Sequence, residues 1–185
     1  MKKTIIAAIV GGIIIFAWQF LTWGALNLHN AQLGYTPKQD SIINFLNTQF
    51  DKEGGYVIPN FAPGASEEEV KKQMVDMEGK PWAQVTYYKS RPGMKQMLIN
   101  MPHSLFIDML IVWLLCWILT KIPNPSFGTI FMGSIGTGLI VFFNTAYIMN
   151  IWYGIFDLMP HFVDALVSWG AVGLWLGWWL RRQKK

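Results

Sequence analysis

The sequence predicts an all-α membrane protein: a four-transmembrane-helix bundle with a small α+β extracytoplasmic cap between its first and second helices. Of the 185 residues, 52% are hydrophobic and only 14% are charged, a balance unlike that of an average soluble domain. Three long stretches carry no charged residue, and a fourth carries one aspartate. Seven basic residues border these stretches without any acid among them, which is the charge pattern of cytoplasmic membrane boundaries.

The four stretches have the length needed to cross a bilayer. A hydrocarbon core about 30 Å thick needs roughly 20 mostly apolar residues in a helix. Within a single membrane domain of residues 1–185 we therefore predict transmembrane helices at residues 4–27, 103–120, 128–149 and 161–180. The first stretch follows two lysines, as a signal peptide would. It exceeds a usual signal-peptide core and has no convincing cleavage site, so we expect an uncleaved anchor.

The basic residues also predict the orientation. They lie at the amino end, in the turn after the second span and at the carboxyl end, so we expect both termini in the cytoplasm. Residues 29–100 are then extracytoplasmic, and this loop is neutral because its eight basic and eight acidic residues balance. Because the remaining basic residues border the membrane, we expect the lipid bilayer and no nucleic acid as a partner.

The loop at residues 29–100 has the sequence features of a small folded unit. Thr36 and Pro37 open an amphipathic helix that we expect to reach about residue 50. Short strands are predicted at residues 56–58 and 84–89. Between them, the sequence SEEE at 66–69 predicts a capping box at the start of a second helix. Two helices and two strands make the predicted α+β cap, which is too small to bury a large core.

Small residues four positions apart predict close contacts between the spans, because they allow helix backbones to approach. The pairs are Ala7/Gly11 and Ala8/Gly12 in the first span and Gly173/Gly177 in the fourth; the third has Thr129, Gly133 and Thr137, with Ser134 and Gly138 alongside.

Each predicted span also carries polar residues toward its extracytoplasmic end. They are Gln19 in the first span, Asp108 in the second, Asn144 in the third, and Asp164 and Ser168 in the fourth. Two interpretations remain open at this point. The polar groups hydrogen-bond between helices and stabilise packing, or the carboxylates mark a path or site for an ion, a proton or a ligand.

The triplet Met-Pro-His occurs twice, at residues 101–103 and 159–161. His103 and His161, with Met101 and Met159, are the candidate metal ligands, and methionine favours Cu(I) or another soft ion. The alternative is that each proline starts a helix and that the methionines near residue 100 form one face of a helix leading into the second span. On this alternative, no cofactor is predicted.

Four segments resemble a set of small inner-membrane proteins of Bacteroidota-type bacteria that have four spans and no assigned activity. The segments are EGKPWAQVTYYKS (78–90), WLLCWILTK (113–121), IWYGIFD (151–157) and SWGAVGLWLGWWLRR (168–182). The resemblance covers nearly the whole chain and implies a bacterial cytoplasmic-membrane location. It brings no catalytic role with it.

Three functions are compatible with these features. The leading interpretation is a non-enzymatic accessory, assembly or structural protein that contacts other membrane subunits or copies of itself, because the cap has no arrangement of catalytic side chains. The second is a small permease or ion-handling protein that uses the polar residues. The third is a metal- or quinone-linked redox protein.

Overall fold

Four long apolar helices form the larger part of the protein, in a computed structural model that describes residues 2–182. In chain order the helical elements of this part are α1 (Lys2–Phe20) with the π-helical turn η1 (Leu21–Ala25), α4 (Met94–Leu119), α5 (Phe127–Phe142) with the π-helical turn η2 (Phe143–Tyr147) and α6 (Ile148–Tyr153), and α7 (Leu158–Arg181). The four continuous helices contain 24, 26, 27 and 24 residues. At about 1.5 Å per residue each can cross a hydrocarbon core, which confirms the prediction of four membrane-length apolar helices.

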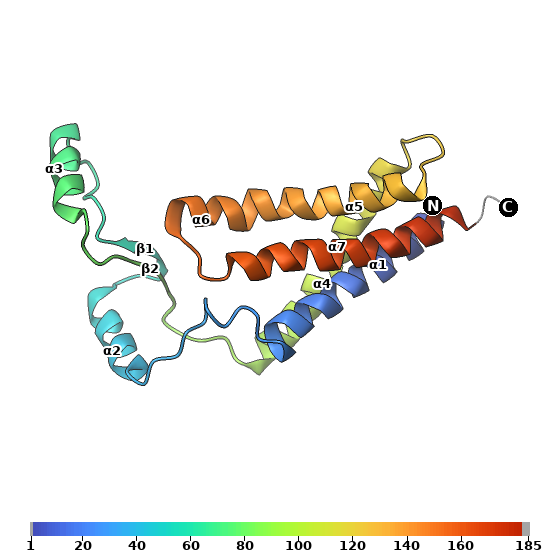
Figure 1. The fold of residues 1–185 in the computed structure, drawn as a ribbon. Helices are drawn as coiled ribbons and strands as arrows, with labels where there is room; N and C mark the ends of the chain where they lie inside the picture. Colours follow the sequence, from blue (N-terminus) through green and yellow to red (C-terminus); the bar gives the residue numbers. More distant parts are fainter. Residues whose placement is uncertain (1, 183–185) are drawn as a thin grey trace. The chain divides into compact units, whose positions relative to one another are not determined.

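Consecutive long helices run in opposite directions (Figure 1). Helix α1 packs against both α4 and α7, and α5 packs mainly against α7. The side chain of Lys3 donates to the carbonyl of Leu180 at 2.8 Å, and the indole of Trp179 donates to the carbonyl of Lys3 at 3.1 Å. These bonds hold the start of α1 against the end of α7. They lie at the opposite end of the helices from the candidate site described below.

Glycines allow the closest approaches between these helices, as their spacing predicted. A Cβ atom at Gly12 would lie 2.7 Å from both the backbone nitrogen and Cα of Met109 in α4. At Gly138 in α5, a Cβ would lie 2.6 Å from the carbonyl oxygen of Ala165 in α7. Both distances are shorter than real side-chain contacts, so the backbones meet there only because the residue is glycine. In contrast, Gly133 has only one neighbouring side chain at 3.4 Å.

Helix α4 begins earlier than the predicted second span. It starts at Met94 after the N-cap Gly93, so Pro102 lies inside the helix instead of at its start. The interpretation of Pro102 as a helix-starting residue is therefore wrong. Proline does start a helix at the second triplet, because Pro160 is in the first turn of α7. The methionines near residue 100 belong to α4 and are exposed, as expected for a helix leading into the span.

Residues 35–92 form a separate compact unit. It contains α2 (Gln39–Gln49), β1 (Gly54–Ile58), α3 (Glu67–Met77) and β2 (Ala83–Tyr87). The strands are antiparallel, with Gly54 opposite Tyr87 and Ile58 opposite Ala83. The hydroxyl of Tyr87 donates to the side chain of Asn47 at 2.6 Å and so links β2 to α2. The two helices and two strands agree with the predicted α+β composition.

The predicted capping box at the start of α3 is confirmed. The backbone nitrogen and the hydroxyl of Ser66 both donate to the Glu69 carboxylate at 2.8 Å, and the Glu69 backbone nitrogen donates to the Ser66 hydroxyl. The backbone bond from Ser66, with the hydroxyl bond second, lowers the pKa of the Glu69 carboxyl below its ordinary value.

Replacement of Ser66 with alanine is expected to loosen α3, because it removes the hydroxyl that accepts from the Glu69 backbone nitrogen. Folding lowers the pKa of Glu69, so the ionised Glu69 carboxylate stabilises the folded state. This stabilisation is complete when the pH is above the pKa of Glu69 in the unfolded chain, and it is lost as the pH falls through the lower pKa of the folded chain. Amide hydrogen exchange of α3 in the full-length protein, followed at neutral and acid pH, measures the stability of this helix in the variant and in the unchanged protein. Exchange should be faster in the variant at neutral pH, and the difference should shrink in acid. Equal exchange at neutral pH would contradict the prediction.

Candidate functional site

Helix α1 is hydrogen-bonded to both of its neighbours through two consecutive side chains. The indole nitrogen of Trp18 donates to Oδ1 of Asp164 in α7 at 2.8 Å. The amide of Gln19 donates to Oδ1 of Asp108 in α4 at 3.3 Å. Asp108 is only 4% exposed, and its Oδ2 has no hydrogen-bond partner among the described residues. The aspartates of α4 and α7 are therefore both held by the end of α1.

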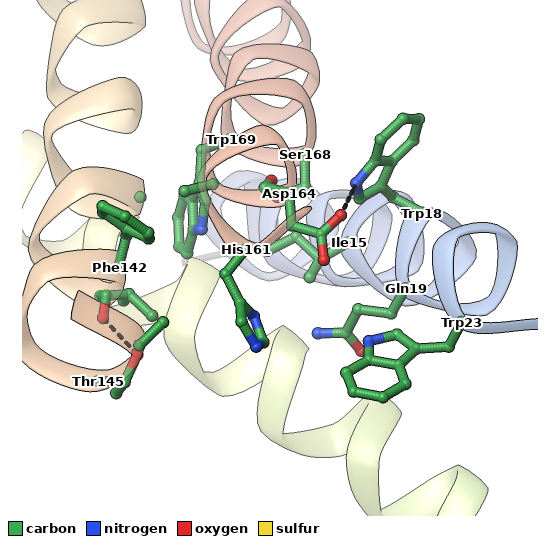
Figure 2. Close-up of a pocket in the computed structure, with 14 residues that line it drawn as sticks. Ile15, Trp18, Gln19, Trp23, Phe142, Thr145, His161, Asp164, Ser168 and Trp169 are labelled. Atoms are coloured by element: carbon green, nitrogen blue, oxygen red, sulfur yellow. Dashed lines mark hydrogen bonds between the residues drawn. The ribbon is translucent and has the colours of Figure 1, made fainter. Parts of the chain in front are cut away.

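A cavity of about 310 Å³ lies beside these residues. Figure 2 shows Trp18, Gln19 and Trp23 on one side of it, with His161, Asp164, Ser168 and Trp169 of α7 and with Phe142 and Thr145 completing the wall. The hydroxyl of Ser168 donates to the Asp164 carbonyl at 2.6 Å, so it satisfies the helix backbone. The cavity thus combines an aromatic wall with a few convergent polar groups, which is typical of ligand sites.

His29 lies between two carboxylates at the edge of this cavity. Its Nδ1 is 2.7 Å from Oδ2 of Asp157, and its Nε2 is 3.0 Å from Oδ2 of Asp164. His29 and Asp157 are each 1% exposed. The ring of Trp23 stacks on the imidazole, with centroids 3.9 Å apart and planes within 3°. The imidazole is therefore fixed in position and orientation on three sides.

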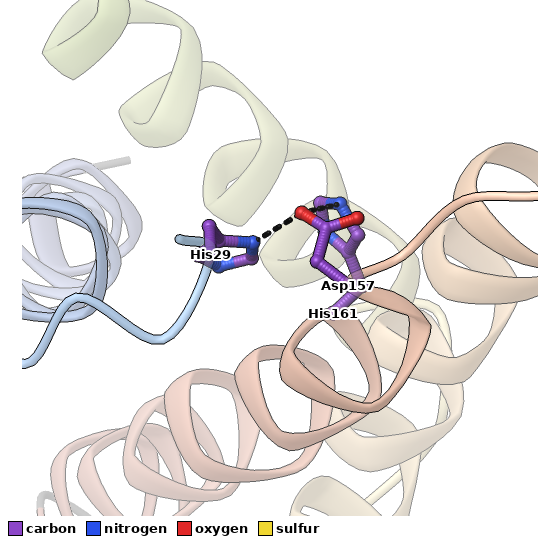
Figure 3. Close-up of side chains that lie close together, drawn as sticks. All are labelled: His29, Asp157 and His161. Atoms are coloured by element: carbon purple, nitrogen blue, oxygen red, sulfur yellow. Dashed lines mark hydrogen bonds and ion pairs between the residues drawn. The ribbon is translucent and has the colours of Figure 1, made fainter. Parts of the chain in front are cut away.

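His161 completes the group. Its Nε2 is 3.3 Å from the same Oδ2 of Asp157, one helical turn away, and its ring centroid is 4.7 Å from that of His29. Figure 3 shows both histidines directed at the Asp157 carboxylate. His29, Asp157 and His161 each offer one ligand atom, and these atoms lie within 4.8 Å of one another.

The chain reaches this arrangement through irregular backbone after α1. The turn η1 widens the helix, and Asn27 then adopts a positive φ of 52°, a conformation that asparagine tolerates better than most residues. The backbone nitrogen of Phe156 donates to the side chain of Gln32 at 3.0 Å. This bond ties the segment that carries His29 to the loop before Asp157, so the two residues meet although they are far apart in sequence.

The charges of the site do not balance without an added cation or proton. Within residues 2–182 the ion pairs are three histidine–aspartate contacts, and no lysine or arginine pairs with an acid. A neutral imidazole has one N–H and one lone pair. Because both nitrogens of His29 face carboxylate oxygens, both contacts are favourable if the ring carries two protons, if one of the two carboxyl groups is protonated, or if a cation lies at one nitrogen.

The structure brings together four of the five residues that the sequence placed in a polar layer. Gln19, Asp164 and Ser168 line the cavity, and Asp108 is joined to it through Gln19. Asn144 is exposed and lies outside this group, so its inclusion was wrong. The wrong helix face was chosen, because Ile140, one turn earlier on the same predicted face and within regular α5, is already 69% exposed, whereas Ser134 and Gly138 are the buried residues.

Of the four candidate metal ligands, only His161 is in the histidine and aspartate group. His103, Met101 and Met159 are exposed, and His103 contributes no atom to that group. The sequence placed His103 at the end of a span. Because α4 starts at Met94, His103 lies instead in the third turn of the helix, on an exposed face. His103, Met101 and Met159 are therefore not part of the group that contains His161.

Sequence reasoning missed His29 and Asp157 as site residues. One signal was present, because Asp157 and His161 are four residues apart and so share a helix face. Asp157 is also one of only three acids outside the large loop. His29 is one of the three histidines of the chain, all near the extracytoplasmic ends of the predicted spans, but no helical period extends to it. Comparisons of the chain with models of protein families, with curated proteins and with solved structures found no match.

Proposed function

We propose that the protein is a multi-pass protein of a bacterial cytoplasmic membrane that binds a cation in the outer half of its helices. In this topology both termini are cytoplasmic and residues 29–100 are extracytoplasmic, as the flanking basic residues favour. The observation that supports cation binding is that three aspartates lack a lysine or arginine partner within residues 2–182. Among the described residues Asp157 and Asp164 pair only with histidines, and Asp108 is in no ion pair but accepts from Gln19.

The energetic argument concerns carboxylates at membrane depth. An ionised carboxylate in a bilayer costs a few kcal/mol by insertion scales unless it is paired, hydrated or protonated. Asp108 and Asp157 are buried, and one oxygen of Asp108 has no hydrogen-bond partner among the described residues. A bound cation would offset this cost. An ion-handling function therefore accounts for these acids better than packing alone, since neutral residues would pack at lower cost.

The second candidate is an accessory function of the small unit, and a different observation favours it. Neither α2 nor α3 buries any residue within the described chain, although Ile42, Phe45 and Val75 are large and exposed. Such surfaces are typical of contacts with another protein or with a membrane. This function is compatible with cation binding in the helices.

A cation panel on the protein purified in mild detergent from its own membrane tests the proposal. We expect at least one of Na⁺, K⁺, Mg²⁺, Ca²⁺, Mn²⁺ and Zn²⁺ to raise resistance to unfolding by sodium dodecyl sulfate at constant ionic strength. A cation at 100 times its Kd would add about 2.7 kcal/mol. The same preparation shows by mass spectrometry whether another subunit accompanies the protein at fixed stoichiometry, as the second candidate predicts.

The control variants separate specific binding from a general salt effect. The double change Asp108→Asn and Asp164→Asn should abolish the stabilisation by the cation. Asp76→Asn, at an exposed position in α3, should retain it. If no cation stabilises the native protein more than the double variant, cation binding is wrong.

A further inference from the structure

We infer that His29, Asp157 and His161 form a binding site for one divalent transition-metal ion of the Zn²⁺ class. This inference rests on the proposed cation-binding function and names the class of cation. The three residues come from two segments of the chain, the loop after η1 and the start of α7. Their ligand atoms lie within 4.8 Å of one another, and the side chains converge on one point (Figure 3).

The distances are close to those of a metal site. Nδ1 of His29 and Nε2 of His161 lie 2.7 Å and 3.3 Å from the same oxygen of Asp157. Zinc bonds of about 2.0–2.1 Å in a tetrahedron put neighbouring ligand atoms roughly 3.4 Å apart. Small side-chain rotations would therefore let the two nitrogens and the carboxylate oxygen share one ion, without rearrangement of the helices.

The donor atoms select the class of metal. Two imidazole nitrogens and one carboxylate oxygen suit zinc and neighbouring first-row metals, whereas Ca²⁺ and Mg²⁺ prefer sites built from oxygen. The three residues contribute no sulfur, and Met101 and Met159 are exposed. Cu(I), which soft sulfur ligands favour, is therefore a poorer match to this set than Zn²⁺.

A neighbouring carboxylate orients the His29 ring for this role. With Nδ1 at the metal, Nε2–H of His29 donates to Asp164, and the other oxygen of Asp164 accepts from the indole of Trp18. Histidine ligands usually donate their second N–H to a carboxylate or carbonyl in this way, which fixes the tautomer and the ring orientation. A metal at Nδ1 also explains how His29 can lie between two carboxylates as a neutral ring. Its Nε2–H donates to Asp164, and the lone pair of Nδ1 binds the ion that Asp157 also binds.

Asp157, the N-cap residue of α7, and His161 in its first turn are already held by the start of this helix. The backbone nitrogen of His161 donates to the Asp157 carbonyl at 3.2 Å, so the two side chains project from the same face one turn apart. His29 comes from the segment that Gln32 ties to the loop before Asp157. A bound ion would therefore fasten the segment after α1 to the start of α7.

Equilibrium dialysis of the full-length protein against Zn²⁺ after removal of metals with a chelator measures stoichiometry and affinity. We expect one Zn²⁺ per chain. Asp164→Asn should weaken binding about 10–100-fold, as loss of an orienting carboxylate does in other sites, and His161→Gln should weaken it further. His103→Gln, at an exposed histidine of α4, should bind as the unchanged protein does.

A spectroscopic variant identifies the ligand directly. His161 has a side chain that is 33% exposed, so His161→Cys is expected to fold. When loaded with Co²⁺, it should show a near-ultraviolet thiolate-to-cobalt band that His103→Cys lacks. Both variants retain the buried Cys116, so that residue cannot account for a difference.

Two results would overturn the inference: no stoichiometric Zn²⁺ binding, or equal spectra for the two cysteine variants. If only alkali or alkaline-earth cations stabilise the protein in the cation panel, the proposed function stands and the transition-metal site is wrong. If no cation stabilises it, both are wrong.

Discussion

Replacing His29 with leucine is expected to destabilise the metal-free protein by about 3–5 kcal/mol, the usual cost of leaving a buried charge without its partner. Asp157 is almost fully buried and would keep only the longer contact with His161. Asp164 would lose its contact with Nε2 of His29. Reversible unfolding in mixed micelles of sodium dodecyl sulfate, with a chelator present, measures the loss.

Two further variants give this prediction its controls. His103→Leu is the same substitution at an exposed histidine and should change stability little. Adding Asp157→Leu to His29→Leu removes the unpaired carboxylate, so the double variant should be more stable than His29→Leu alone. If His29→Leu unfolds at the same detergent fraction as His103→Leu, the buried pair has no such role.

Replacing Gly12 with alanine is expected to destabilise the packing of α1 on α4 by about 1–3 kcal/mol, the usual cost of overpacking. The new Cβ would lie 2.7 Å from backbone atoms of Met109, and backbone cannot move aside as a flexible side chain can. The helices must therefore separate. Since Met109 follows Asp108, the hydrogen bond from Gln19 to Asp108 should lengthen as well. The same detergent titration measures the loss of stability.

Gly136→Ala is the matched control for this change. Gly136 lies in α5, and a Cβ there would have no neighbouring atom within 4 Å. Alanine favours the helix over glycine by up to about 1 kcal/mol, so this variant should be as stable as the unchanged protein or more so. If Gly12→Ala were equally stable, the close approach of α1 and α4 would not constrain residue 12.

Sequence alone predicted the features that depend on neighbouring residues. Apolar length marks the long helices, because a span must be covered by apolar side chains along its whole course. The capping box at Ser66 was recognisable because its partners are three residues apart. The close contact at Gly12 followed from the spacing of small residues, since that spacing repeats on one helix face, whereas in α5 the close contact is at Gly138 and not at Gly133 of the predicted stripe.

Part of the candidate site could also be predicted. Gln19, Asp108, Asp164 and Ser168 were identified because strongly polar side chains are rare in apolar helices. Asn144 was wrongly included because it shares a helix face with the exposed Ile140, whereas α5 buries the face of Ser134 and Gly138. Pro102 was wrongly read as the start of a helix because α4 continues two turns upstream of it, through residues that are less apolar than the span itself.

The sequence by itself determined four membrane-length apolar helices, a small α+β unit between the first two, and a set of polar residues toward one end of the helices. Only the tertiary structure decided which of these residues meet. His29 lies outside the regular helices, and its position depends on the turn at Asn27 and on the bond between Gln32 and Phe156. Contacts between segments so distant in sequence leave no local periodicity, so the pairing of His29 with Asp157 and Asp164 could be recognised only in the folded chain.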